Sequence, residues 1–246
     1  MEDASRNARI AALEAELAEL RAEVQEFTAT VSHDLRAPLR HIVSYTQMVQ
    51  EDAGPLLNGE VQEFLATITS SARHMGLLLD GLTALSKVGS VPLVFESVPL
   101  QDAIQEVCDR LASGCPQRVV DWQLPADLPV VLVDATLMQL VLEQVLGNAL
   151  KFTAPRASAL IVVSAVPAEQ AGHVRLQVRD NGVGFNPAMQ AQLFRVFGRL
   201  HSAQQFEGIG MGLVLSRKRV QRMGGAMDIE GVVDGGCGVT LTLPLA

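Results

Sequence analysis

A regular stripe of apolar residues runs through the beginning of this sequence. Its members are separated alternately by three and four positions, the a/d pattern of a coiled coil: Ile10, Leu13, Leu17, Leu20, Val24, Phe27 and Val31. Glu, Arg and Ala fill most of the positions between them, so the apolar face is narrow. An amphipathic helix that packs on its own domain has a wider apolar face. The stripe therefore predicts a coiled-coil helix over residues 1–30 and favours a second copy of the chain as its partner.

The same periodicity continues toward residue 50 through Leu35, Leu39, Ile42, Tyr45 and Val49. We expect the first helix to run past Pro38, because a proline inside a helix can bend it without ending it. Turn-forming residues follow at 52–55 and 58–59, and then comes a second helical stripe: Val61, Leu65, Ile68, Ala72, Met75, Leu79, Leu82 and Leu85. Residues 27–88 are thus expected to form a helical hairpin, and two hairpins would make a dimeric four-helix bundle.

The pattern changes after a linker expected at residues 89–96. Short β-branched runs replace the long stripes at residues 118–124, 130–133, 160–166, 174–179 and 239–243. Helical stretches are expected at 100–113, 135–151 and 213–223. The chain is therefore expected to be a two-domain protein. Its second domain, over residues 97–246, would be an α+β sandwich in which helices cover one face of a mostly antiparallel sheet.

Charge and composition bear on the partners and the compartment. The net charge of −8 argues against a nucleic-acid partner, because phosphate binding needs clustered Lys and Arg. Three cysteines without CxxC spacing favour free thiols in a reducing compartment over a disulfide or metal site. No apolar run approaches the roughly 20 residues of a membrane span, and no signal-peptide pattern is present. We expect a cytoplasmic protein without direct membrane contact, with any sensory domain outside this chain because only nine residues precede the stripe.

Two glycine-rich loops indicate an anionic ligand. Asp180-Asn181-Gly182-Val183-Gly184 follows a predicted strand, where the glycines would let backbone approach a ligand; taken alone, a simple β-turn explains it as well. Gly208-Ile209-Gly210-Met211-Gly212 opens a predicted helix, whose free N–H groups and dipole suit phosphate. The sequence contains no GxxxxGK[ST], and the GxGxG spacing is not that of dinucleotide folds.

The helix expected at 135–151 carries polar side chains at helical spacing. Gln144 and Asn148 are four positions apart and share a face, with Lys151 close by. An amide can ligate Mg²⁺, and an ammonium can meet phosphate oxygens. Each alone would pass for a solvated helix residue, but their placement before the two glycine loops favours a shared ligand site.

Together these segments resemble a sensor histidine kinase. The run from Ser32 to Leu39 resembles the H box of that family, and the other four boxes follow in the family's order: residues 148–153 the N box, 180–185 the G1 box, 193–197 the F box and 208–213 the G2 box. The sequence around His33 and the run from Phe197 to His201 are most similar to the phytochrome-linked branch.

The resemblance implies a phosphoacceptor hairpin followed by an ATP-binding domain of the Bergerat type, shared with gyrase, Hsp90 and MutL. By matched position, Asp180 would accept the adenine amino group and Phe152 would border the base. Asn148 would bind Mg²⁺, and Lys151 and Arg199 would contact phosphates. Residues 201–207 would form a lid. The remaining expected contacts are Gly182, Gly184, Gly208, Gly210 and Gly212 at the nucleotide and Thr240 near the adenine site.

His33 would be the phosphoryl acceptor, with Asp34 orienting its ring, and a response-regulator receiver domain would take the phosphoryl group from it. Two positions depart from the family's pattern. Gln144 stands where the family has Asn, which keeps a second amide for Mg²⁺ but at longer reach, so ATP affinity is expected to suffer. Ala37 stands where kinases that also act as phosphatases carry Thr or Asn, so weak phosphatase activity is expected.

Two rival functions remain open at the level of sequence. An ATP-hydrolysing clamp would need a carboxylate at position 144 to activate water, and the amide of Gln144 cannot act as that base. A dimeric pseudokinase or phosphorelay scaffold is disfavoured by His33, Asn148 and the intact glycines, but Gln144 keeps it open.

Overall fold

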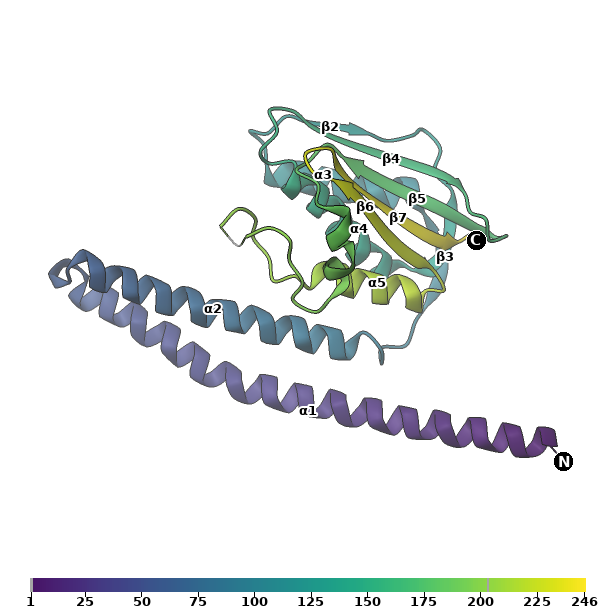
Figure 1. Cartoon of the computed structure of the whole chain (residues 1–246), viewed down its shortest axis with the longest axis horizontal. Coiled ribbons are helices and arrows are strands. Elements are labelled where there is room, and N and C mark those ends of the chain that lie inside the picture. The colour runs from purple at the N-terminus through teal and green to yellow at the C-terminus, as the bar shows by residue number, and fades with distance from the viewer. Residues whose placement is uncertain (1, 203) are drawn as a thin grey trace. The chain divides into compact units, whose positions relative to one another are not determined.

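A computed structural model describes residues 2–202 and 204–246, without the side chains of residues 2–5 and 8. Met1, at the start of the expected coiled coil, and Ala203, in the expected lid, lie outside the described residues. The chain divides into two compact units, one ending at Ser90 and the other beginning at Val91 (Figure 1). The expectation of a helical region followed by an α+β domain is confirmed.

The first unit is a helical hairpin. Helix α1, Glu2–Ala53, contains Pro38 and continues unbroken through it. A 3₁₀ turn at Gly54–Leu56 leads to α2, Gly59–Lys87, whose N-cap Asn58 accepts a hydrogen bond from the backbone N–H of Val61 at 2.9 Å. The two long helices run back along each other (Figure 1).

The contact between α1 and α2 is made of small and partly polar side chains. Its buried members are Thr28, Ser32, Thr46, Thr69, Ala72 and Gly81, and Thr69 donates a hydrogen bond to the hydroxyl of Thr46 at 2.9 Å. Many large apolar side chains of the hairpin are instead exposed: Leu35, Ile42, Tyr45, Met48, Val49, Phe64, Ile68, Met75, Leu77 and Leu82. Others, such as Leu39, Leu65 and Leu79, are half-buried. A single hairpin therefore leaves a large apolar surface uncovered.

The second unit contains two sheets. The larger has the strand order β2-β4-β5-β7-β6, made of Val120–Gln123, Ala159–Pro167, His173–Asp180, Gly236–Pro244 and Ala226–Val232. Only its β2–β4 pair is parallel. The smaller sheet pairs β1, Phe95–Pro99, with β3, Val130–Asp134. The main sheet is thus mostly antiparallel, as expected.

Two of these strands escaped the sequence analysis. In β1, which begins inside the expected linker, only Val98 is buried, so no apolar alternation marks it. In β6 the buried Met227 and Ile229 alternate with the exposed acidic residues Asp228 and Glu230, and the run follows directly on a helix. Strand β3 also differs from the expectation, because it pairs with β1 outside the main sheet.

Three helices pack on one face of the main sheet (Figure 1): α3, Leu100–Gly114; α4, Ala135–Phe152; and α5, Gly212–Arg222. A shorter 3₁₀ segment, Pro187–Phe194, follows β5. Apolar side chains of α4, such as Met138, Leu142 and Leu146, are fully buried against the sheet. Asp134 caps α4 by accepting a hydrogen bond from the backbone N–H of Leu137 at 3.0 Å. The core thus holds α4 in place, with its last turns beside the end of β5.

Candidate nucleotide-binding site

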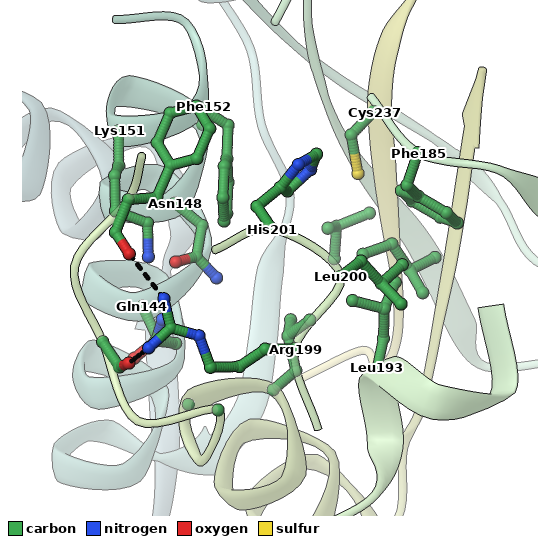
Figure 2. A pocket seen from close by; sticks show the side chains of 18 of the residues that line it. Gln144, Asn148, Lys151, Phe152, Phe185, Leu193, Arg199, Leu200, His201 and Cys237 are labelled. Carbon is green, nitrogen blue, oxygen red and sulfur yellow. Dashed lines mark hydrogen bonds between the residues drawn. The ribbon is translucent and has the colours of Figure 1, made fainter. Parts of the chain in front are cut away.

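A pocket of about 290 Å³ lies between α4, the ends of β5 and β7, and the segment from Gly198 to Leu213 (Figure 2). Most of the residues predicted for the nucleotide line it: Gln144, Asn148, Lys151, Phe152, Asp180, Gly184, Arg199, Gly208, Gly210 and Gly212. These residues come from segments that are far apart in sequence. The fold therefore brings the two glycine loops and the polar face of α4 into one site.

Helix α4 provides one wall of the pocket. Gln144, Asn148 and Lys151 lie on successive turns and line the pocket, while neighbouring positions of the helix enter the core. Within the part of the chain that the structure describes, the side chain of Asn148 has no hydrogen-bond partner. Its amide oxygen is therefore available to a ligand, and the residue fits the expected role toward Mg²⁺.

Asp180 ends strand β5 and lines the pocket. Its Oδ1 accepts a hydrogen bond from the backbone N–H of Gly182 at 2.8 Å. Burial raises the pKa of Asp180 to about 6, although the backbone N–H groups of Gly182 and Cys237 act in the opposite direction. A buried carboxylate with spare acceptor capacity suits a ligand that brings its own N–H donor.

The glycines of the first loop are required by close backbone approach. A Cβ on Gly182 would lie 2.6 Å from the carbonyl oxygen of Phe152, so the loop packs directly on the end of α4. Gly182 does not itself line the pocket. Gly184 has a positive φ of 57°, and a Cβ there would lie 1.9 Å from the carbonyl oxygen of Val232.

Two cationic side chains, Lys151 and Arg199, also line the pocket. Nζ of Lys151 donates to the carbonyl of Glu207 at 3.2 Å, and Nη2 of Arg199 donates to the carbonyl of Phe206 at 2.7 Å. Nη1 of Arg199 donates to the carbonyl of Gly208. Burial, together with the charge of Arg199, lowers the pKa of Lys151. Both cations thus hold the same segment of backbone, at the start of the second glycine loop.

Three rings meet at the pocket, and two of them, His201 and Phe206, belong to the expected lid, for which the sequence predicts no individual contacts. The centroid of Phe152 is 5.6 Å from that of His201 and 4.9 Å from that of Phe206, and His201 is 5.3 Å from Phe206. Nε2 of His201 lies 3.0 Å from the carbonyl oxygen of Gly184. Phe206 is buried although it sits in a polar segment, and an apolar ring in such a segment is the signal that could have identified it.

Thr240, expected near the adenine site, does not line the pocket. It lies on β7 next to Val239, and side chains alternate between the two faces of a strand. Val239 and Cys237 therefore line the pocket while Thr240 points to the other face, where it is paired with Gln177 and Asp228. Burial raises the pKa of Cys237 to about 12, with smaller contributions from Asp180 and Glu230, so it stays a neutral thiol.

His33 and Asp34 belong to the hairpin unit. The side chain of His33 is 87% exposed, and its Nδ1 lies 3.1 Å from Oδ1 of Asp34. This arrangement leaves Nε2 directed to solvent when Nδ1 carries the proton. Arg36 and Ala37 lie with His33 along a hollow between the two helices. The expected surface position of His33 and its pairing with Asp34 are both seen here.

Neither a metal-ligand cluster nor a membrane span occurs among the described residues. No group of three or more His, Cys, Asp or Glu side chains there could hold a metal ion. None of the described helices combines the length and the apolar character that crossing a membrane requires.

Both units match known protein families. Residues 23–90 match the family described as "His Kinase A (phospho-acceptor) domain". Residues 133–246 match the family described as "Histidine kinase-, DNA gyrase B-, and HSP90-like ATPase". The first match contains His33, and the second contains every residue that lines the pocket.

The chain is also similar to individual proteins. Cyanobacterial phytochrome B of Nostoc sp. (strain PCC 7120) is 29% identical over 235 residues, which cover 95% of this chain and 31% of that protein. The cell-division control histidine kinase PdhS of Brucella abortus (strain 2308) is 28% identical over 211 residues, which cover 80% of this chain and 20% of that protein. The chain thus spans less than a third of the length of these curated relatives.

Solved structures share the fold. Full-length ShkA in complex with AMPPNP has a TM-score of 0.63 at 24% identity, covering 90% of this chain and 46% of that one. The histidine kinase AdeS of Acinetobacter baumannii has a TM-score of 0.57 at 18% identity, covering 87% of this chain and 98% of that one. With a phosphoacceptor hairpin and a histidine-kinase-type ATPase domain in one chain, and phytochromes and PdhS among its relatives, this chain belongs to the sensor histidine kinases.

Proposed function

We propose that this chain is an ATP-dependent histidine autokinase, which phosphorylates His33 and passes the phosphoryl group to an aspartate of a response-regulator receiver domain. The observation that carries the proposal is the pocket itself, which is lined by a buried carboxylate, Asp180, and by two cations, Lys151 and Arg199. This distribution of charge matches a ligand with an amino-bearing base and a polyphosphate. The AMPPNP in the complex of ShkA, a protein of the same fold, is a ligand of this kind.

In the proposed complex each wall of the pocket has one task. Asp180 accepts the adenine amino group, and Phe152, with His201 and Phe206 next to it, borders the base. Lys151 and Arg199 meet phosphate oxygens in place of the backbone carbonyls that they now hold. Asn148 supplies the amide oxygen for Mg²⁺. Bound there, Mg²⁺ would neutralise charge on the phosphates.

The phosphoryl transfer uses the geometry of His33. Asp34 accepts the hydrogen bond of Nδ1–H, which leaves the lone pair on Nε2 free to attack. A bond forms between Nε2 and the γ-phosphorus while the bond from that phosphorus to the bridging oxygen of ADP breaks. Positive charge develops on the ring, and the carboxylate of Asp34 stabilises it by taking up the Nδ1 proton.

The hairpin supports a homodimer as the working form. Ile68, Met75 and Leu82 recur at intervals of seven along α2 and stay exposed in the single chain. A second hairpin would cover them in a four-helix bundle, and the seam over residues 1–30 would continue the contact as a coiled coil. Dimerisation would therefore bury the large apolar surface of the hairpin.

The receiver domain of a response regulator is the proposed second partner. The hollow beside His33 contains Arg36, Arg40 and Arg73, and the phosphorylated imidazole would be reached there. Because Ala37 offers no polar group next to His33, phosphatase activity is proposed to be weak. The free cysteines Cys108, Cys115 and Cys237 fit a cytoplasmic, reducing environment.

Incubation with γ-labelled ATP and Mg²⁺ tests the proposal. The wild-type chain should acquire an acid-labile label, and His33→Gln should acquire none while still binding ATP, because His33 is exposed and lies outside the pocket. Release of phosphate without labelled protein would instead support an ATP-hydrolysing clamp. If the protein acquires no label and releases no phosphate, the result would support a phosphorelay scaffold.

A further inference from the structure

Gln144 is the pocket residue whose side chain has an unusual environment. It precedes Asn148 by four positions on α4 and lines the same pocket, so the sequence alone assigns it as a second amide ligand for Mg²⁺ (Figure 2). Its side chain is one methylene longer than that of Asn. This extra length decides what the amide contacts.

The amide of Gln144 lies against Gly212, the first residue of α5. A Cβ built on Gly212 would stand 2.2 Å from Cδ, 2.3 Å from Oε1 and 2.4 Å from Nε2 of Gln144. Because these three distances are nearly equal, the amide group covers the glycine with its face. The terminal group of Gln144 therefore fills a space that only a glycine at position 212 leaves open.

The contact between Gln144 and Gly212 lies at the first turn of α5, which has little local stabilisation of its own. Met211, the N-cap of α5, makes no side-chain capping hydrogen bond, so the first turn lacks the usual local stabilisation. This turn also ends the second glycine loop, Gly208 to Gly212, which lines the pocket beside Lys151 and Arg199. A contact between α4 and this turn thus fixes the loop that faces the phosphates.

Asn148 offers a contrast within the same helix. Among the described glycines, none has the side chain of Asn148 in the space where its Cβ would stand. Its amide is therefore free to meet a cation, whereas that of Gln144 is taken up by packing. The two amides on one face of α4 consequently have different roles.

We propose that Gln144 is a positioning residue, which holds the first turn of α5 and the phosphate-facing glycine loop against α4, and that Mg²⁺ is ligated by Asn148 without it. The proposal rests on the proposed nucleotide site. It explains how a chain that lacks the family's Asn at this position keeps an ordered glycine loop, because Gly212 accommodates the longer side chain.

The first test separates positioning from metal ligation. ADP affinity is measured by calorimetry in EDTA and in Mg²⁺ for the wild type, Gln144→Ala, Gln144→Asn and Asn148→Ala. Both Gln144 variants should weaken ADP binding by about tenfold under both conditions, because the glycine loop loses its support either way. Asn148→Ala should reduce the gain from Mg²⁺. The proposal is overturned if Gln144→Ala reduces the Mg²⁺ gain as Asn148→Ala does, with binding in EDTA unchanged.

The second test needs no nucleotide and remains informative if the proposed function is wrong. Thermal unfolding is followed for Gly212→Ala in the wild-type and Gln144→Ala backgrounds. The added methyl group should lower Tm in the wild type and lower it much less in Gln144→Ala, where the amide no longer occupies its place. Equal losses in both backgrounds would show that the two residues are not coupled. If the wild type binds no ADP, the proposed nucleotide site is wrong. The double-mutant cycle of Gln144→Ala and Gly212→Ala would still show whether the two residues are in contact.

Discussion

Asp180 shows how burial of a single side chain links binding to pH. The usual pKa of an aspartate is 3.8, and burial raises that of Asp180 to about 6. The folded state therefore takes up a proton more readily than the unfolded chain. The contribution of Asp180 to the free energy of unfolding is therefore fully present below about pH 4. It is lost as the pH rises through about 6.

ADP affinity should consequently fall as the pH drops below about 6, by up to about tenfold for each pH unit, because the neutral carboxyl is a weaker acceptor for the adenine amino group than the carboxylate. Calorimetry between pH 5 and 8 measures the profile. Asp180→Asn is the matched control, since its remaining pH dependence reports the titration of the phosphates. Identical profiles for the two proteins would refute the assignment of Asp180.

Ala37 is the residue-scale basis for the expected lack of phosphatase activity. It lies one helical turn after His33 and faces the same hollow, but a methyl group cannot orient a water molecule. The purified chain should leave the decay rate of a phosphorylated response regulator unchanged. Ala37→Thr should accelerate that decay. Faster decay of the phosphorylated response regulator in the presence of the wild-type chain would contradict the expected lack of phosphatase activity.

Glycine substitutions test how tightly the backbone is packed in helix α4 and in the first glycine loop. Gly147 lies inside α4 with nothing within 4 Å of the place where an added methyl group would stand, so Gly147→Ala should raise the free energy of unfolding by about 1 kcal/mol. Gly184→Ala should destabilise the domain, because its positive φ and the carbonyl of Val232 leave no room for a side chain. Chemical denaturation measures both, and equal effects would mean that the loop is not tightly packed.

The lid is the element whose position depends most on contacts with other elements. Its expected range, residues 201–207, includes His201 and Phe206, whose rings pack at a tilt against Phe152 of α4. Its end is held by Lys151 and Arg199. The sequence predicts a mobile glycine-flanked segment here, but only the fold shows which ring and which cations meet it.

At the scale of the whole molecule, the exposed stripe of the hairpin should govern assembly. Ile68→Lys places a charge in the proposed dimer seam and should convert the dimer to monomers, as measured by light scattering. Leu77→Lys is the matched control, because Leu77 is more exposed on the same helix but lies off the heptad series of Ile68, Met75 and Leu82. A dimer that survives Ile68→Lys but not Leu77→Lys would place the seam on another face.

Local periodicity and motif spacing were enough to predict the helices and loops that depend on neighbouring residues. The two long helices, helix α4 and the two glycine loops could all be predicted, because helical periodicity and glycine spacing depend on residues that are close in sequence. Strand β6 was not predicted, although Met227 and Ile229 alternate with Asp228 and Glu230, because this short run follows directly on a helix. Whether Thr240 reaches the pocket also depends on more than the local sequence. One step of strand register decides whether Thr240 or Val239 faces the pocket, and cross-strand pairing alone sets that register.

Contacts between residues that are distant in sequence follow from the packed fold. The tilted ring contact of Phe206 with Phe152 and the amide of Gln144 over Gly212 join positions dozens of residues apart, and the burial that raises the pKa of Asp180 also depends on the packed fold. Each is a matter of close packing, in which a shift of one side chain changes which atoms touch. Motif spacing can say that such residues share a site, but the packed core determines what each does there.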